Sequence, residues 1–534
     1  MAEKTVFIRT TSGLVREFGA LDVMLMMGIG IFALQSSTLQ FPWFYGFNPG
    51  ANLPSALALT LVPTGLLMIV YWATGVIMPR SGSDYVWVAR ITHPAVGFAW
   101  SLVYIFGMMM VGYVMTASTQ VFLISSELTT WAVLYNIPSL VALGTWLTSP
   151  VGSFLFGTLI TVVYSLIAIF GARATKTILY LSWGFAVTAL ILMVGLLLST
   201  TPAAFAAKWD SVFSQYSTYQ KIFDLASSSG LSPAALNVSL GATIGSLPLA
   251  MLFLMGGAWG NMVAGEIRNV KRSLPVALLV SMFVGFGIWV TVSTSTILAV
   301  GEKWMTALGY LWGVAPSAYP LPYPPTQPML LALIAYPNQA LVLLVLFLFY
   351  AGNIAQPYVF LVFPTRMFFG WAFDRVIPTK MADVNKRFRT PHYAIIATGV
   401  LAVIMLTLYS FPGYAPAFAI ATFIQLAAWT VIALTVAVFP YVRKDLLELA
   451  PPFMRKRVAG VPAISLIGII TTILFALISA EELINPLVTP SATLAGMLII
   501  PTIVIGFVIY YASVAYHKRK GIDMQLAFKE IPPV

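Results

Sequence analysis

The sequence predicts an all-α membrane protein with twelve transmembrane helices and both termini on the cytoplasmic side. Of its 534 residues, 59% are hydrophobic and only 8% are charged, whereas roughly a quarter of the residues of a soluble domain are charged. The apolar stretches run for roughly 20 residues or more, the length that a helix needs to cross a bilayer. They do not alternate as the strands of a membrane barrel do, so helices are the remaining way to satisfy the backbone in lipid.

Twelve apolar segments, separated by polar or proline-containing stretches, are the predicted helices. They cover residues 19–40, 53–78, 96–124, 151–172, 177–200, 241–267, 274–300, 339–365, 393–410, 416–440, 462–485 and 492–516. The stretch 300–338 contains six prolines between positions 316 and 328. Because proline interrupts a helix, we expect an extracellular loop there with a short helix at its start.

The basic residues set the predicted orientation. Lys208, Lys221 and Lys303 lie in loops on one side of these spans, and the other 25 of the 28 Lys and Arg lie in the loops and tails of the opposite side. Basic residues gather on the cytoplasmic side of membrane proteins, so that side holds both tails, 1–18 and 517–534. The net charge of +11 then reflects topology and attraction to anionic lipids, and no nucleic-acid partner is expected.

The sequence lacks the residues that several kinds of metal, redox and ATP-driven chemistry require. The chain has no Cys, which excludes thiolate metal sites, iron–sulfur clusters and disulfides. Its three histidines, His93, His392 and His517, all lie near predicted cytoplasmic helix ends, so a haem or copper centre is not expected. A phosphate-binding loop of the GxxxxGK[ST] type is absent. We therefore expect neither an enzyme nor an ATP-driven pump, and no cofactor or metal.

Glycines occur in the middle of two predicted spans. Gly28 and Gly30 lie in the first, and Gly256, Gly257 and Gly260 lie in the sixth. Glycine weakens a helix, and an unwound segment in the membrane is tolerated only around a cavity or ligand. Close helix packing through small residues is the alternative. The spacing of about 230 residues fits two five-helix repeats of inverted topology with a binding site between them.

The predicted domains follow from these repeats. Residues 19–200 form the first five-helix repeat, 201–240 an extracellular loop, 241–440 the second repeat, and 441–516 the last two helices.

Four segments resemble the amino acid–polyamine–organocation (APC) transporters. Residues 27–32 (MGIGIF) are similar to the IGxGIF motif of the family's first helix, and residues 263–275 (VAGEIRNVKRSLP) to its AGE(I/V)KNPxRxxP signature. Residues 79–85 (PRSGSDY) resemble its PRSGGxY loop, and residues 366–378 the pattern that follows its eighth helix. The family has the five-plus-five inverted repeat with two further helices. The chain departs from the family at Val270, where proline is usual, and at Ala258, where many members carry an acid.

The resemblance implies a secondary transporter of amino acids or related amines. In such members the amides of the first-helix break bind the substrate carboxylate, and carbonyls of the sixth bind its ammonium group. The corresponding positions here are Gly28, Ile29 and Gly30, and Gly256, Gly257 and Ala258. Two opposed half-helix ends suit a zwitterion, since one end is positive and the other negative. Trp259 is a candidate gate or pocket wall, with an ordinary packing role as the alternative.

The acidic residues favour a neutral amino acid with an apolar side chain. The acids in or at the ends of spans are Asp22, Glu127, Glu266, Glu481 and Glu482, and none is predicted at a midplane. A cationic substrate is expected to need a buried carboxylate partner. Glu266 is a candidate for an inner gate network with Arg80, Arg90 or Arg268, or for a solvated helix end.

The sequence says less about which gradient is coupled to transport. In this family a sodium site resembles a cage of first-helix carbonyls and eighth-helix hydroxyls, yet residues 338–364 contain no Ser or Thr, only Asn353 and Gln356 as amides. Sodium coupling is therefore not expected. Protons, through Glu266 or Asp22, counter-substrate exchange and uniport all stay open.

Two classes of function fit a transporter-like chain of the plasma membrane. The first is a working carrier, and the second is a transport-inactive sensor or structural subunit of a larger complex. The glycines in both breaks favour the carrier, since a protein that only senses or supports would not need opened helices.

Overall fold

The computed structural model describes residues 14–27, 40–411, 420–484 and 492–529. In these ranges ten helices are long and apolar enough to cross a membrane. They are α4 (Leu53–Ile77), the helix Pro94–Tyr135, α9 (Pro150–Ile169), α10 (Ala172–Leu198), α15 (Val270–Val300), the helix Gln339–Phe373, α20 (His392–Ser410), α22 (Ala421–Val442), α25 (Ala463–Ile484) and α26 (Ala492–Arg519). Each overlaps a predicted span, which confirms a polytopic, all-helical membrane protein.

The first and sixth predicted spans are not single long helices in the part of the chain that the structure describes. The first contributes α1 (Ala20–Met26), and residues 28–39 lie outside the described residues. Helix α3 (Phe41–Phe47) begins just after the predicted end of this span at residue 40. The sixth consists of α13 (Leu240–Gly245), α14 (Leu247–Leu252) and the 3₁₀ segment η4 (Met255–Glu266). The count of twelve transmembrane helices stays a prediction.

The third span is much longer than the predicted 96–124. It runs through α6 (Pro94–Tyr104), a π-helical turn η2 (Ile105–Met109) and α7 (Met110–Tyr135). Its outer part contains Ser125, Ser126, Glu127, Thr129 and Thr130, which suggested a loop, yet all five are buried. The short helix α8 (Pro138–Thr148) packs along this part of α7, so protein rather than lipid surrounds the polar side chains.

The eighth span, predicted as 339–365, is interrupted and extends further. Helix α18 (Gln339–Gly352) ends before Asn353 and Ile354, and α19 (Ala355–Phe373) continues beyond them. The interruption places two residues between helical segments in the interior, where Asn353 is fully buried.

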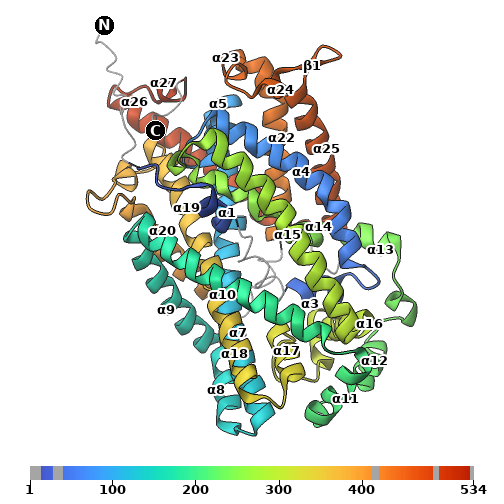
Figure 1. The fold of residues 1–534 in the computed structure, drawn as a ribbon. Coiled ribbons are helices and arrows are strands. Elements are labelled where there is room, and N and C mark those ends of the chain that lie inside the picture. Colours follow the sequence, from blue (N-terminus) through green and yellow to red (C-terminus); the bar gives the residue numbers. More distant parts are fainter. Residues whose placement is uncertain (1–13, 28–39, 412–419, 485–491, 530–534) are drawn as a thin grey trace.

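Short helices cover the end of the bundle that is predicted to be extracellular, at the bottom of Figure 1. They are α11 (Pro202–Phe213), α12 (Tyr219–Ser228), η3 (Pro233–Leu236), α16 (Glu302–Gly313), η5 (Pro316–Ala318) and α17 (Gln327–Ala335). The expected short helix at the start of 300–338 is α16. Helix α17 was not expected, and it accommodates Pro328 because proline fits the first turn of a helix.

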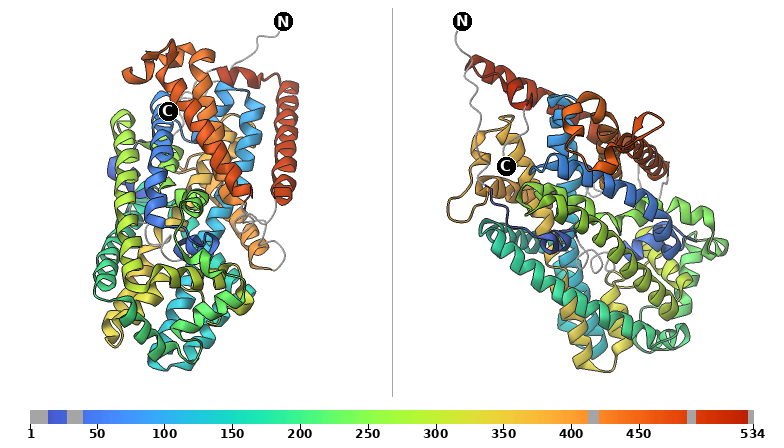
Figure 2. Two further views of the ribbon diagram at one scale, coloured as in Figure 1. Left: turned by 90° about the vertical axis from the view of Figure 1, so that its right-hand side faces the viewer. Right: turned by 45° about the horizontal axis from the view of Figure 1, so that its top comes forward.

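The opposite end carries the basic segments and small elements, at the top of Figure 1. These elements are α5 (Ser83–Ile91), η6 (Thr379–Ala382), α23 (Lys444–Leu447), α24 (Pro452–Arg455), the hairpin β1 (Arg457–Val458) and β2 (Val461–Pro462), and α27 (Met524–Lys529). Figure 2 shows α26 at the edge of the bundle, where it packs against α6.

Close helix pairs form the interior. Helix α22 packs along α25, α4 along α15, and α10 along α18. Helices α3 and α16 cross at Gly46 and Gly309, where a Cβ atom on either glycine would overlap the backbone of the other segment. These contacts bring segments from both predicted repeats around one central space.

Candidate functional site

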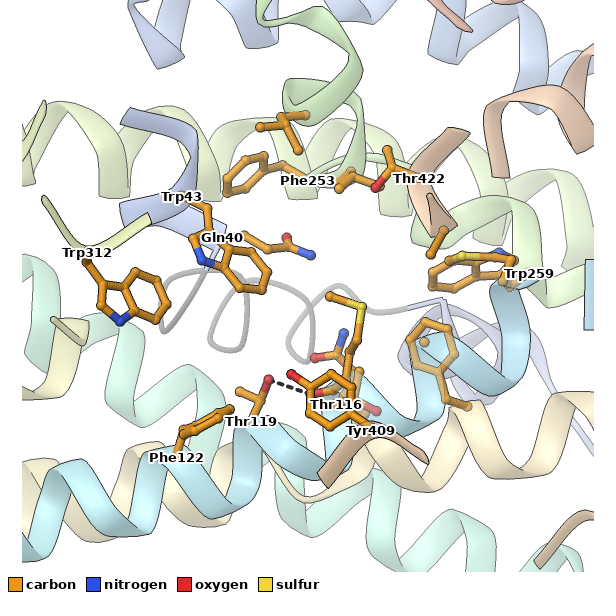
Figure 3. Close-up of a pocket in the computed structure, with 18 residues that line it drawn as sticks. Gln40, Trp43, Thr116, Thr119, Phe122, Phe253, Trp259, Trp312, Tyr409 and Thr422 are labelled. Atoms are coloured by element: carbon orange, nitrogen blue, oxygen red, sulfur yellow. Dashed lines mark hydrogen bonds between the residues drawn. The ribbon is translucent and has the colours of Figure 1, made fainter. Parts of the chain in front are cut away.

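A cavity of about 140 Å³ lies in the middle of the bundle. Its wall is formed by Gln40 and the first turn of α3, by η2, α7, α14, η4, α16, α19 and α20, and by the first turn of α22 (Figure 3). The residues that line it are Gln40, Trp43, Met108, Gly112, Met115, Thr116, Thr119, Phe122, Leu249, Leu252, Phe253, Trp259, Trp312, Gln356, Phe360, Tyr409, Ala421 and Thr422. The first, third, sixth, eighth and tenth predicted spans therefore meet at one site.

The lining is apolar and aromatic, and none of these described residues carries a charge. Two hydroxyls in the wall are already used by their own helix, since Thr116 donates to the Tyr113 carbonyl at 2.9 Å and Thr119 to the Met115 carbonyl at 2.8 Å. In contrast, Gln40 Oε1 and Gln356 Oε1 are buried without a hydrogen-bond partner. Because unpaired buried polar atoms are costly, these two amides are available to a ligand.

Trp259 closes one side of the cavity in a fixed orientation. Its indole N–H donates to Gln425 Oε1 at 3.1 Å, and the same oxygen accepts a hydrogen bond from the Tyr104 hydroxyl at 3.3 Å. The Trp259 and Phe360 rings meet edge to face at a centroid distance of 4.7 Å. Trp259 is thus a wall residue oriented by Gln425 and Phe360, whereas the sequence left an ordinary packing role as an alternative.

The glycines of the sixth span lie in the segment that carries Trp259 to the cavity. Segment η4 begins at Met255, after α14 has ended, and includes Gly256, Gly257 and Ala258. Of η4, only Trp259 is among the lining residues. Gly260 has no room for a side chain, because a Cβ atom there would overlap the Met27 side chain at the end of α1. The other half of the predicted site, Gly28, Ile29 and Gly30, lies outside the described residues.

Glu266, at the end of η4, forms a buried ion pair with Arg366 of α19. Arg366 Nε lies 2.9 Å from Glu266 Oε1 and its Nη2 lies 2.8 Å from Oε2, so both oxygens are bound. The Ser81 hydroxyl is 3.4 Å from Oε1. Arg366 was not among the partners expected for Glu266, which were Arg80, Arg90 and Arg268. Helix α19 continues past the predicted end of the span at residue 365 and carries Arg366 into contact with η4.

Arg90 forms a second buried pair at the same end of the bundle. Its guanidinium binds both oxygens of Asp374, at 2.9 and 3.2 Å, and the Tyr85 hydroxyl donates to Asp374 at 2.9 Å. Arg80 lies nearby in the loop after α4. Burial, followed by repulsion from Arg16 and Arg90, lowers the pKa of Arg80 to about 10. These contacts fix α5 against the end of α19.

Asp22 of α1 is bound on several sides. Its carboxylate lies 3.0 Å from Lys176 Nζ, accepts a hydrogen bond from Tyr180 at 3.0 Å, and accepts another from the Gly19 amide at 2.7 Å. Just before it, Phe18 pairs with Ile267 in a parallel bridge, since the Phe18 amide donates to the Glu266 carbonyl and the Arg268 amide to the Phe18 carbonyl. The start of the first span is thus joined to the end of the sixth.

A serine from α10 bridges the interruption of the eighth span. The Ser182 hydroxyl donates to the Gly352 carbonyl at 2.8 Å and accepts from the Ala355 amide at 3.2 Å. Asn353 donates to the Phe349 carbonyl at 2.7 Å, while its Oδ1 has no partner. The hydroxyl that reaches this break therefore comes from the fifth span and is already bonded on both sides.

Comparison with known proteins decides the family. The family model described as "Amino acid permease" matches residues 20–513, which is most of the chain. The chain belongs to the amino acid permease family. A search of curated proteins with the sequence gave no match.

A solved structure shares the fold of this permease. It is the crystal structure of MhsT in complex with L-phenylalanine, which aligns with a TM-score of 0.54 and 13% sequence identity. The alignment covers 88% of this permease and 99% of MhsT. Family and fold are those of membrane transporters, and the fold is the one that the APC resemblance predicted.

Sequence reasoning placed some lining residues and missed others. Trp259 and Gln356 line the cavity, Asn353 lies in the interruption of the eighth span, and Gly256 to Ala258 lie in η4, the segment that contains Trp259. Asp22 and Glu266 lie instead in the ion pairs at the predicted cytoplasmic end. Gln425, Ser182 and Arg366 were missed as parts of the site. Each is a polar side chain in or next to an apolar span, and that was the signal in the sequence. The partner of each side chain depends on how distant segments pack, which the sequence does not show.

Proposed function

We propose that this permease is a secondary active transporter of neutral amino acids with apolar side chains. The observation that supports it is the cavity itself: aromatic and aliphatic side chains line it, with amides and hydroxyls as the polar groups and no charged side chain among the described residues. Pockets that select small molecules combine a mostly apolar wall with a few placed polar groups.

The same lining argues against charged substrates. An arginine or polyamine in this cavity would leave a positive charge away from water without a carboxylate partner, which is expensive inside a membrane. A glutamate would face the equivalent problem with a negative charge. A zwitterion differs, because its two charges can lie at helix ends that offer amides and carbonyls.

We infer that the zwitterion lies between the first and sixth spans. Its carboxylate would bind amides of Gly28, Ile29 and Gly30, and its ammonium group would bind carbonyls of Gly256, Gly257 and Ala258. The apolar side chain would then extend toward Trp259, Phe253 and Phe360. MhsT, which shares the fold, was crystallised with L-phenylalanine, an amino acid of this class.

Transport would proceed by alternating access around these two spans. The buried Glu266–Arg366 and Arg90–Asp374 pairs and the Asp22–Lys176 pair join α1, η4, α5, α10 and α19 at one end. We infer that this end faces the cytoplasm of a cell whose plasma membrane holds the protein, and that these pairs keep that side closed. Opening inward would require them to separate, and opening outward would leave them intact.

Ligand binding in detergent tests the proposed substrate class. Thermal unfolding of the purified permease is measured with single amino acids, because a ligand that binds the folded state alone raises the unfolding temperature. Phenylalanine, leucine and methionine should stabilise the protein, and arginine, putrescine and glutamate should not. Stabilisation by arginine or glutamate but by none of the apolar amino acids would contradict the proposal.

A further inference from the structure

A buried acid with no hydrogen-bond partner lies behind the cavity wall. Glu482, near the end of α25, is 0% exposed, and neither of its carboxylate oxygens makes a hydrogen bond. Asp22 and Glu266, the acids that the sequence suggested as proton carriers, are instead held in ion pairs at 3.0 and 2.8 Å. The charge of each is therefore already matched by a basic partner, Lys176 for Asp22 and Arg366 for Glu266.

The helices that pack against α25 have no charged side chain that could pair with Glu482. Helix α25 packs against α22, α4 and α14, and these three segments contain no Asp, Glu, Lys, Arg or His. Their titratable groups are Tyr71 of α4, which donates to Asp84, and Tyr441 at the far end of α22. Arg455 of α24 and Arg457 of β1 lie at the other end of α25. An isolated carboxylate in such surroundings is costly, and taking up a proton removes the charge.

Two further acids share this half of the molecule. Glu481, the neighbour of Glu482, is only half-buried and lies beside Gly245 of α13, where a Cβ atom would be 3.4 Å from its Oε1. Glu302 accepts a hydrogen bond from the Asn52 amide at the start of α4, at 2.9 Å. Glu482 differs from both, because it is closed off from solvent and neither of its oxygens makes a regular hydrogen bond to a described residue.

Glu482 also contacts the part of α22 that forms the cavity wall. Its carboxylate lies against the Phe423 backbone amide, in a geometry too poor for a regular hydrogen bond. Phe423 follows Ala421 and Thr422, which line the cavity (Figure 3), and precedes Gln425, which holds Trp259. The first amides of a helix lack partners within it and form its positive end. A charged Glu482 would be drawn to them, and a neutral one would not.

We propose that Glu482 is the proton-binding site of this permease. The carboxylate takes up one proton on one side of the membrane, changes from charge −1 to neutral, and returns that proton to water on the other side. Because the charged form binds the first turn of α22 and the neutral form releases it, the proton changes the cavity wall at Ala421 and Thr422. The coupling to transport rests on the proposed function, whereas proton binding itself does not.

Infrared difference spectroscopy tests proton binding without any substrate. The purified permease is compared at acidic and alkaline pH, and the C=O stretch of protonated carboxylic acids is followed. The Glu482→Gln variant should lose a band that Glu481→Gln and Glu127→Gln keep. Glu127 is the competing candidate, since it too is buried and has an unpartnered Oε1. A Glu482→Gln spectrum identical to wild type, or loss of the band in Glu127→Gln instead, overturns the proposal.

Proteoliposomes then test the coupling. Coupling of one proton to one substrate permits about tenfold accumulation per unit of pH gradient. Wild type and Glu481→Gln should accumulate labelled amino acid under such a gradient. Glu482→Gln should fall to the level seen without a gradient while still exchanging internal for external substrate, and Glu482→Asp should retain part of the response. Gradient-driven accumulation in Glu482→Gln, or none in a wild type that does exchange, would refute the coupling. A wild type that neither takes up nor exchanges amino acids would instead refute the proposed function.

Discussion

Gln425 fixes the orientation of Trp259 within the membrane interior. It is fully buried, and its Oε1 accepts hydrogen bonds from both Trp259 and Tyr104. Removing this acceptor takes one hydrogen bond from each of two buried donors, and a hydrogen bond contributes about 0.5–1.5 kcal/mol to stability. A residue that touches no ligand can thus set the shape of the cavity.

The first prediction concerns this contact. Gln425→Leu should weaken amino acid binding by on the order of tenfold, since about 1.4 kcal/mol corresponds to that factor, with expression little changed. Trp259→Phe, which replaces the indole by a smaller aromatic ring and removes the N–H, should show a loss in the same direction. Binding is measured by titration with labelled substrate. Unchanged affinity in both variants would show that the hydrogen bond does not shape the site.

The second prediction concerns the Glu266–Arg366 pair. Glu266→Gln leaves the Arg366 guanidinium buried without a countercharge, and breaking a buried pair in this way costs about 3–5 kcal/mol. The unfolding temperature in detergent should fall clearly. The exposed Arg443–Asp445 pair, at 2.7 Å, is the matched control: Asp445→Asn should change stability by about 0–1 kcal/mol. Equal losses of stability in the two variants would mean that burial does not make the Glu266–Arg366 pair more costly to break than the exposed pair.

The interruption of the eighth span, between α18 and α19, limits which cations the chain can bind at that point. Ser182 from α10 bonds to Gly352 and Ala355 on either side of Asn353. A cation needs several oxygen ligands that are free to turn toward it. At this interruption the Ser182 hydroxyl and the Gly352 carbonyl are already bonded to each other. Among the described residues, Asn353 Oδ1 and Gln356 Oε1 are the buried, unpartnered side-chain oxygens of this span, fewer than a cation cage needs.

The third prediction is that transport is indifferent to sodium. Uptake of labelled amino acid into proteoliposomes should be the same in sodium and in choline buffer, and an imposed sodium gradient should not drive accumulation. Ser182→Ala provides a second test, since it should lower the unfolding temperature without creating sodium dependence. Accumulation driven by a sodium gradient alone would be incompatible with this view of the eighth span.

The sequence predicted the long helices well because their signal is local. An unbroken apolar run such as 177–200 needs no knowledge of its neighbours to be recognised as a membrane helix. The outer part of α7 was missed because Ser125, Glu127 and Thr130 are polar, and their burial depends on α8, α17 and α18, which pack against this part of α7.

The site was harder to predict because it depends on contacts between distant segments. Glycines marked the sixth span, where α14 ends and η4 begins. Nothing local indicates that Glu266 pairs with a residue 100 positions away, or that Gln425 faces Trp259, 166 positions away. Such pairs form when helices pack. The helical period shows on which face of a helix a residue lies, but it limits only loosely which other helix that face contacts.

For the molecule as a whole, the distribution of charge defines the expected orientation. The ends of the bundle differ, with the basic segments 366–389 and 443–457 at one end and α11, α12 and α16 at the other (Figure 1). The positive-inside rule then assigns the basic end to the cytoplasm.

The fourth prediction tests this orientation by labelling single cysteines. The chain has no native Cys, so each introduced one gives an unambiguous signal. Ser214 and Ser228, which are exposed on the short helices of one end, should react as cysteines with a membrane-impermeant reagent in intact cells. Thr379→Cys, equally exposed at the basic end, should react only after the cells are opened. The reverse pattern would invert the topology.

The most direct test of the central claim is uptake of labelled phenylalanine into proteoliposomes that contain the purified permease, with unlabelled compounds as competitors. The account predicts saturable uptake, competed by leucine and methionine and not by arginine, putrescine or glutamate, because no charged side chain of the described residues lines the cavity. Gly112→Leu, which forces a side chain against Phe360 in the cavity wall, should abolish it. Uptake competed by arginine or glutamate as well as by leucine, or no uptake of any apolar amino acid by a folded protein, would contradict the account.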